Sequence, residues 1–148
     1  MKLGLNWTEK MYFKAHADGH EVGMDAKAPV GQGKALNPKQ LVLSGLMGCT
    51  AMDVVAFLRK HRQELEAFDI EIDVDTSDPK IHPTVFTAAT LRFQLQGKAL
   101  DSQVALEAVQ LSQTQYCGVS AMLSKAFPIR YEVFVNGKLI GQGQAQFA

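Results

Sequence analysis

Two cysteines, Cys49 and Cys117, are the residues of this 148-residue chain best suited to chemistry. A thiolate is a nucleophile and a metal ligand, so two thiols that meet can form a reversible disulfide or hold a metal ion. Neither cysteine belongs to a C-x-x-C pair, the close spacing typical of metal sites. We therefore expect no metal, and two alternatives stay open: a redox-active pair and two inert buried thiols.

Small residues flank both cysteines. If both segments are helical, Gly45 lies one turn before Cys49 and Ser120 lies one turn after Cys117. Packed helices usually stand about 8–10 Å apart, whereas a disulfide requires Cα atoms within about 7 Å, so small residues favour the necessary close approach. Easier helix packing explains the same residues equally well, so this pattern alone does not decide between the two alternatives.

The composition is that of a folded, non-exported protein. Basic and acidic residues number 15 each and apolar residues make up 47% of the chain. Balanced charge argues against nucleic acid and against an anionic membrane surface as partners. The N-terminal segment MKLGLNWTEK becomes polar too soon for a signal peptide. We expect a cytoplasmic protein, in which a permanent structural disulfide is disfavoured.

The N-terminal part of the chain predicts a strand meander followed by a long helix. Apolar and polar residues alternate at about 3–7, 11–16 and 20–25, and Asp18-Gly19 is typical of a type I′ hairpin turn. Asn37-Pro38 is a helix start, with Asn as the N-cap and Pro at the first helical position. We expect this helix to run to about Glu64.

Leu41 to Leu58 is apolar on nearly every face of the predicted helix. Its interior Asp53 and the charged residues that follow it favour a buried helix over a membrane span. A helix that is apolar all round must be covered all round, and one sheet and one further helix scarcely suffice. We expect a second copy of the chain to supply the missing cover, which makes the protein a homodimer.

The C-terminal part predicts four more strands and one more helix. Alternating patterns indicate strands around 70–74, 91–95 and 129–135, and the Asn136-Gly137 turn leads into a last strand from Lys138. Between the second and third of these strands, Asp101 or Ser102 caps a helix expected to reach about Lys125. The prediction is one α+β domain over residues 1–148, with the order β-β-β-α-β-β-α-β-β, a mainly antiparallel sheet and two packed helices.

Both cysteine segments resemble motifs of one known family. NPKQLVLSGLMGCTAMDVV resembles the first-cysteine helix of the OsmC/Ohr family of organic hydroperoxide reductases and osmotically induced proteins, where an Asn/Ser-Pro helix start precedes the reactive cysteine by about eleven residues. LSQTQYCGVSAMLSK is similar to the second motif, a helix beginning Leu-Ser that carries Tyr-Cys and then Val-Ser. The predicted element order fits the same family along essentially the whole chain.

The resemblance implies a thiol-peroxidase cycle without a cofactor. Cys49 would attack the hydroperoxide and become a sulfenic acid, Cys117 would condense with it to a disulfide, and a small dithiol would restore both thiols. The family also implies an intertwined homodimer with its sites at the subunit interface. The partners expected are thus a second copy, a small hydroperoxide and a dithiol reductant.

The sequence departs from the family's peroxidases around the thiolate. In those enzymes an arginine from the N-terminal half and a glutamate just after the helix-start proline assist it, whereas no arginine precedes Arg59 here and Lys39 and Gln40 follow Pro38. The candidate supporting residues are therefore Lys39, Gln40, Asp53 and Tyr116, with Lys34, His16 and His20 as further sources of positive charge.

Two functions of different kinds follow from these observations. The first is an organic hydroperoxide reductase that binds an apolar substrate. Its substrate pocket would be lined by Leu46, Met47, Met52, Tyr116 and Met122. The second is a non-enzymatic protein of the same fold that binds a small ligand or senses redox state. The missing arginine and glutamate favour the second function, and the retained cysteine pair favours the first.

Overall fold

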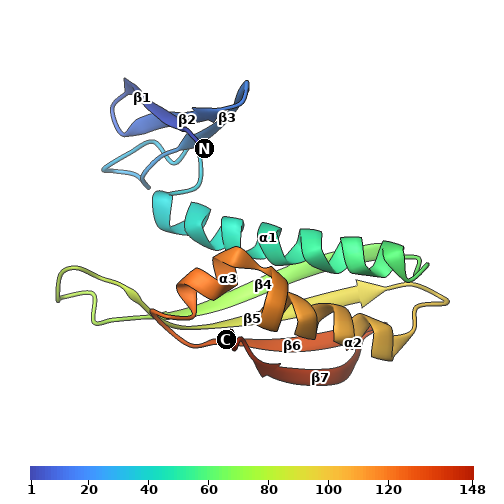
Figure 1. The fold of residues 1–148 in the computed structure, drawn as a ribbon. Coiled ribbons are helices and arrows are strands. Elements are labelled where there is room, and N and C mark those ends of the chain that lie inside the picture. The colour runs from blue at the N-terminus through green and yellow to red at the C-terminus, as the bar shows by residue number, and fades with distance from the viewer. The chain divides into compact units, whose positions relative to one another are not determined.

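The computed structural model describes residues 1–148, which divide by their internal contacts into two compact units, Met1–Gly45 and Leu46–Ala148 (Figure 1). The boundary falls inside helix α1 (Pro38–Lys60), which contributes its first turns to one unit and the rest to the other. The expectation of a single domain over 1–148 stays a prediction.

The N-terminal unit is built on a three-stranded antiparallel meander, β1 (Gly4–Glu9), β2 (Tyr12–Ala17) and β3 (His20–Met24). Between β2 and β3, Asp18 and Gly19 have φ angles of 52° and 80°, the two positive values that a type I′ turn requires. The predicted meander and its turn are both confirmed.

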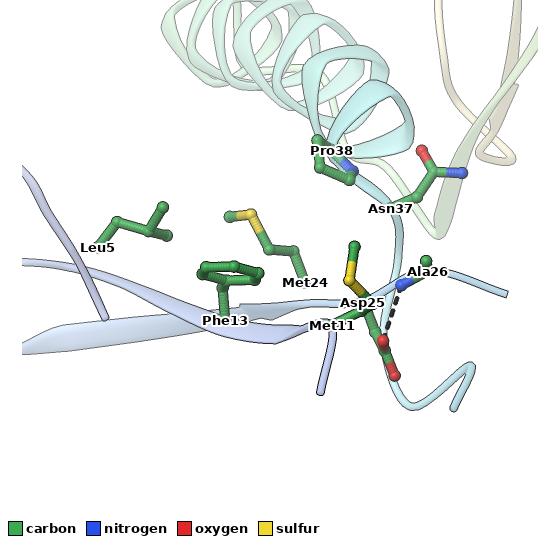
Figure 2. Close-up of a pocket in the computed structure, with 8 residues that line it drawn as sticks. All are labelled: Leu5, Met11, Phe13, Met24, Asp25, Ala26, Asn37 and Pro38. Carbon is green, nitrogen blue, oxygen red and sulfur yellow. Dashed lines mark hydrogen bonds between the residues drawn. The ribbon is translucent and has the colours of Figure 1, made fainter. Parts of the chain in front are cut away.

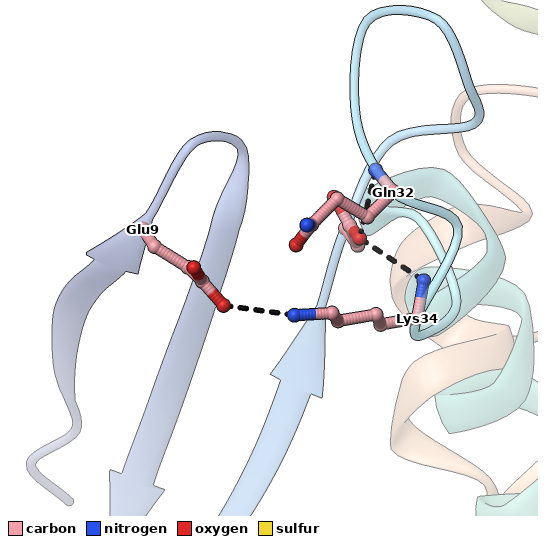
Figure 3. A network of polar contacts seen from close by, with 4 residues as sticks. Glu9, Gln32 and Lys34 are labelled. Atoms are coloured by element: carbon pink, nitrogen blue, oxygen red, sulfur yellow. Dashed lines mark hydrogen bonds and ion pairs between the residues drawn. The ribbon is translucent and has the colours of Figure 1, made fainter.

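The loop after β3 is organised around the buried carboxylate of Asp25. Its oxygens accept hydrogen bonds from the backbone N–H groups of Ala26, Gln32 and Lys34, at 2.7, 3.2 and 3.0 Å. These bonds, above all the one from Lys34, lower the pKa of Asp25 although burial opposes them. The Lys34 ammonium also reaches Glu9 at 2.8 Å, which ties the loop to β1 (Figure 3).

A reciprocal capping box opens α1. The Asn37 side chain accepts a hydrogen bond from the Gln40 N–H, and the Gln40 side chain accepts one from the Asn37 N–H, both at 2.9 Å. The predicted Asn37-Pro38 helix start is confirmed, and Gln40 has a structural task at the helix end.

The helix ends at Lys60 rather than near Glu64 as expected. Arg62 adopts the left-handed conformation with φ 54°, and the N–H of Gln63 bonds back to the Leu58 carbonyl at 2.9 Å. This is the Schellman arrangement that stops a helix, here without the usual glycine. Because no glycine marked it, the sequence pattern extended the helix by about one turn.

The C-terminal unit contains a four-stranded sheet in the order β4 (Ala67–Thr76), β5 (Phe86–Gln96), β6 (Ile129–Val135) and β7 (Lys138–Gln144). β5 and β6 pair in parallel because the helical segment between them crosses over, and the other pairs are antiparallel. The predicted α+β class and mainly antiparallel pairing are confirmed.

Helices cover one face of this sheet (Figure 1). On β5, the alternate residues Leu91, Phe93 and Leu95 are fully buried, as a strand with one face on a core requires. They share one core with residues of α2 (Ser102–Leu111) and with Leu46, Val54 and Leu58 of α1. With the buried Thr50, these α1 residues form a row at intervals of four residues.

Only that one row of α1 is buried within the chain. By length and composition α1 could cross a membrane, a test that core helices also pass, and just 22% of its most apolar window is buried. Val42 and Met52 are among its exposed apolar side chains. The chain by itself therefore leaves much of this helix uncovered.

The second predicted helix is broken in two, which corrects the expectation of one helix to Lys125. α2 ends at Leu111, a π-helical turn follows over Ser112–Tyr116, and α3 spans Gly118–Leu123. Cys117 stands at the break with extended backbone angles, φ −70° and ψ 101°. Cys117 therefore does not lie inside one continuous helix, as that expectation required.

Candidate active site

The break in the second helix positions Cys117. The Cys117 N–H bonds to the Ser112 carbonyl at 2.9 Å, which closes the π-helical turn, a feature frequent at functional sites. Cys117 then caps α3, and its sulfur accepts a hydrogen bond from the Ser120 N–H at 3.3 Å. The side chain is fully buried, so the backbone fixes the thiol where solvent does not reach it.

Cys49 lies on the middle turns of α1 and is half-buried. One of its neighbours, Thr50, belongs to the buried row, and Asp53 follows one helical turn later. The reactive groups of Cys49, Asp53 and Cys117 all lie within 4.8 Å of one another. The structure thus brings together both cysteines and one of the four supporting candidates.

A chain of hydrogen bonds joins α1 to the π-helical turn beside these groups. Gln113 Nε2 donates to Thr50 Oγ1 at 2.9 Å, Thr50 and Ser112 share a hydroxyl hydrogen bond of 2.8 Å, and Ser112 Oγ donates to Asp53 Oδ2 at 2.9 Å. Thr50, Ser112 and Gln113 are all buried, so these bonds are shielded from water.

The surroundings of Cys117 hold it in the thiol form. Burial, with a smaller contribution from the neighbouring Cys49, raises the pKa of Cys117 to about 11, and the hydrogen bonds from Ser120 only partly oppose this. Near neutral pH, Cys117 therefore carries its proton, while Cys49 is the thiol that solvent can reach.

The same three groups are the chain's one candidate set of metal ligands. Two thiols and a carboxylate can coordinate zinc, although a structural site normally has four ligands. The expectation of a metal-free protein stays a prediction.

Of the other supporting candidates, Lys39 and Gln40 lie elsewhere, whereas Tyr116 shares a hollow with Asp53. Lys39 and Gln40 belong to the first turn of α1, and the nine residues from Gln40 to Cys49 correspond to about 14 Å of helix rise. The exposed Tyr116 lines an open hollow of about 390 Å³. The other residues around the hollow are Asp53, Ala56, Phe57 and Lys60.

Part of the predicted apolar lining belongs to the core instead. Leu46 is fully buried in the hydrophobic core, and Met47 packs against it. Met52 and Met122 are 75% and 65% exposed. Of the residues named for the lining, only Tyr116 borders the hollow.

A second hollow, of about 240 Å³, lies in the N-terminal unit (Figure 2). Leu5, Phe13 and Met24 form its apolar wall on one face of the meander. Its remaining lining residues are Met11, Asp25, Ala26, Asn37 and Pro38.

Lys34, one of the proposed sources of positive charge, is paired with Glu9.

Thr50 and Ser112 were not predicted from the sequence as part of the site. A signal for Thr50 was present, because it is the one polar residue in the four-residue row Leu46, Thr50, Val54, Leu58. A polar side chain in such a row must find a buried partner. Ser112 carried no comparable signal, since its role depends on the π-helical turn.

Comparisons with known proteins agree with the fold. The family model described as "OsmC-like protein" matches residues 31–132, over half of the chain. The chain is 35% identical to Protein YhfA of Escherichia coli K12 over 136 residues, which are 90% of this chain and 98% of that one.

Two solved structures show the same fold. The OsmC-like protein from Mycoplasma pneumoniae has a TM-score of 0.76 at 14% identity, covering 90% of this chain and 95% of the other. The organic hydroperoxide resistance protein OhrB of Bacillus subtilis has a TM-score of 0.64 at 20% identity, covering 90% and 96%.

Proposed function

The chain belongs to the OsmC-like protein family, and from this premise we propose that it reduces organic hydroperoxides with Cys49 as the peroxidatic and Cys117 as the resolving cysteine. The observation that supports this most strongly is the approach of the two sulfurs to within 4.8 Å, with one thiol accessible and the other buried. The fold neighbour from Bacillus subtilis carries organic hydroperoxide resistance in its name.

The proposed cycle divides the two roles by accessibility. The Cys49 thiolate attacks the outer peroxide oxygen, the O–O bond breaks, and an alcohol leaves with a proton from solvent. Cys49 is then a sulfenic acid, and attack by the Cys117 sulfur gives a disulfide and water. A dithiol such as a lipoyl group reduces this disulfide and returns the protein to its starting state.

The hollow beside Asp53 suits an apolar peroxide. Phe57, Ala56 and the Tyr116 ring provide apolar walls, and Lys60 provides one cation at its edge. Such a surface favours an alkyl or aryl hydroperoxide over hydrogen peroxide, since burial of the organic group adds binding energy of about 25 cal/mol per Å².

We further propose that the working form is a homodimer. Apolar side chains exposed on α1 include Val42 and Met52, and those on β1 include Leu5 and Trp7. Large apolar side chains exposed on a helix and on a strand favour contact with another protein surface. A second copy of the chain would cover it, as the family resemblance also implies.

A peroxidase assay tests the proposal. Wild-type protein with cumene hydroperoxide and dihydrolipoamide should consume peroxide over many turnovers, whereas Cys49→Ser should consume none above background. Cys117→Ser should react once and stop as a sulfenic acid that dimedone traps. The chain has two cysteines, so the mass of the intact protein assigns each product.

Turnover by Cys49→Ser equal to that of the wild type would overturn the proposal. If folded, reduced wild-type protein consumes no peroxide, the non-enzymatic alternative takes its place. The specific observation for that alternative is the apolar hollow of the N-terminal unit, which has room for a small ligand.

A further inference from the structure

We propose that Asp53 is the catalytic base of the resolving step, accepting the Cys117 proton as the Cys117 sulfur attacks the oxidised sulfur of Cys49. This rests on the proposed function and adds to it the step by which the disulfide closes. Asp53 is the one carboxylate among the three groups that lie within 4.8 Å of one another.

The resolving step requires a base because of where Cys117 lies. A thiol is a poor nucleophile until it loses its proton, and Cys117 is fully buried, away from bulk water. Burial disfavours the charged thiolate, so Cys117 does not ionise freely before it attacks. A base within the protein must therefore take the proton during the attack.

The hydrogen-bond chain beside the cysteines is directed toward this carboxylate. The Ser112 hydroxyl donates its one hydrogen to Asp53 Oδ2. In its contact with Thr50, Ser112 must therefore be the acceptor and Thr50 the donor. Thr50 in turn accepts from the amide Nε2 of Gln113. Every donor in the chain thus points to Asp53, an arrangement that suits an acceptor.

These contacts hold the Asp53 carboxylate in place through one of its two oxygens. Ser112 occupies Oδ2, whereas Oδ1 makes no hydrogen bond and is free to accept a proton. Hydrogen bonds of catalytic bases are often long before the reactants are in place, so the present separation is compatible with this role.

In the resolving step, Cys117–SH and Cys49–SOH give the Cys117–Cys49 disulfide and one water molecule, with no further oxidant or reductant. The S–H bond of Cys117 and the S–O bond of Cys49 break, and the S–S bond forms. The Cys117 proton passes to Asp53 and from there to the leaving hydroxide, which completes the water.

The test separates the two chemical steps. Reduced wild-type protein and Asp53→Asn are mixed with one equivalent of cumene hydroperoxide, and samples are quenched to measure sulfenic acid with dimedone and disulfide by mass. In Asp53→Asn, closure of the disulfide, measured from the sulfenic acid once it has formed, should be about 100-fold slower than in the wild type. Asp53→Glu should restore part of that rate.

A second reaction tests the base without any peroxide. The reagent DTNB converts the accessible Cys49 to a mixed disulfide, and attack by Cys117 then expels the coloured thionitrobenzoate. Asp53→Asn should slow this second release by a similar factor. Asparagine keeps an acceptor for Ser112, so the variant retains the local contacts, and Asp69→Asn on the exposed side of β4 is the matched control.

The possible results are distinguishable. Failure of wild-type protein to react with peroxide would refute the proposed function, while the DTNB reaction would still judge Asp53. Equal rates of disulfide closure in Asp53→Asn and wild type would overturn the assignment of Asp53. Equal slowing in Asp69→Asn would do the same, because the effect would then reflect net charge.

Discussion

Cys49 and Cys117 carry the same functional group in very different surroundings. Cys49 is half-buried on a regular helix, and Cys117 is fully buried at a break between two helices. Burial disfavours the charged form of a thiol, which raises the pKa of Cys117 to about 11. Cys49 is thus available to a reagent from solvent, whereas Cys117 stays buried and protonated.

The raised pKa of Cys117 makes stability depend on pH in the alkaline range. Below about pH 9 the thiol is neutral in the folded and unfolded chains, so its contribution is complete. Between pH 9 and about 11 only the unfolded chain loses the proton, and stability falls by about 3 kcal/mol for the reduced protein.

Urea denaturation of the reduced protein at pH 8, 9, 10 and 11 checks this expectation. Cys117→Ser should show a smaller decline over the same range, because serine does not ionise there. The remaining decline would include Tyr131, whose pKa burial also raises. Parallel declines in the wild type and the variant would show that Cys117 contributes nothing to it.

At the scale of single elements, the end of α1 shows how a local conformation can be tested. Arg62 holds a left-handed conformation with φ 54°, which glycine adopts without steric cost. Arg62→Gly should therefore stabilise the protein by up to about 1 kcal/mol.

The matched variant is Arg59→Gly, three residues earlier in the last turn of the same helix. There glycine replaces a good helix former and should destabilise the protein by about 1 kcal/mol. Opposite shifts in the free energy of unfolding are expected from the same residue change. Shifts of the same sign would mean that Arg62 does not end the helix in solution.

Sequence patterns predicted the elements well and their irregularities poorly. Asp18-Gly19, Asn37-Pro38 and Asn136-Gly137 each mark a boundary through a local backbone preference, and the structure has a boundary at each. The break before Cys117 has no such origin, because the π-helical turn is held by bonds from Ser112 and Gln113 to another helix.

The candidate site shows the same division. Both cysteines and Asp53 were named from the sequence, and the structure places their reactive groups together. Gln40 was named for its position after the helix-start proline, but its side chain caps the helix. Periodicity locates residues on one element, whereas contacts between elements require the fold.

At the scale of the whole molecule, the uncovered surface of α1 makes assembly the main expectation. A stable interface of standard size buries about 1,600 Å² in total, and the homodimer should bury at least this much. Met52, 75% exposed on α1, should lie within it.

Light scattering coupled to size exclusion checks the assembly. Wild-type protein should elute as a dimer at micromolar concentration, and Met52→Glu should shift it toward the monomer by placing a charge in an apolar contact. Ile81→Glu makes the same kind of change at an equally apolar, 64% exposed position in the β4–β5 connection and should leave the dimer intact. A monomeric wild type would contradict the expectation.

In the proposed cycle, the deep burial of Cys117 would limit the number of turnovers that one molecule completes before irreversible oxidation. Disulfide closure is a unimolecular event within one chain, whereas attack of a second peroxide on the Cys49 sulfenic acid is bimolecular and gives an irreversible sulfinic acid. Slow attack by Cys117 would lengthen the lifetime of the Cys49 sulfenic acid. The fraction of molecules overoxidised in each cycle would then rise with peroxide concentration. If the protein reduces hydroperoxides as proposed, it would scavenge scarce peroxide and would be inactivated when peroxide is abundant.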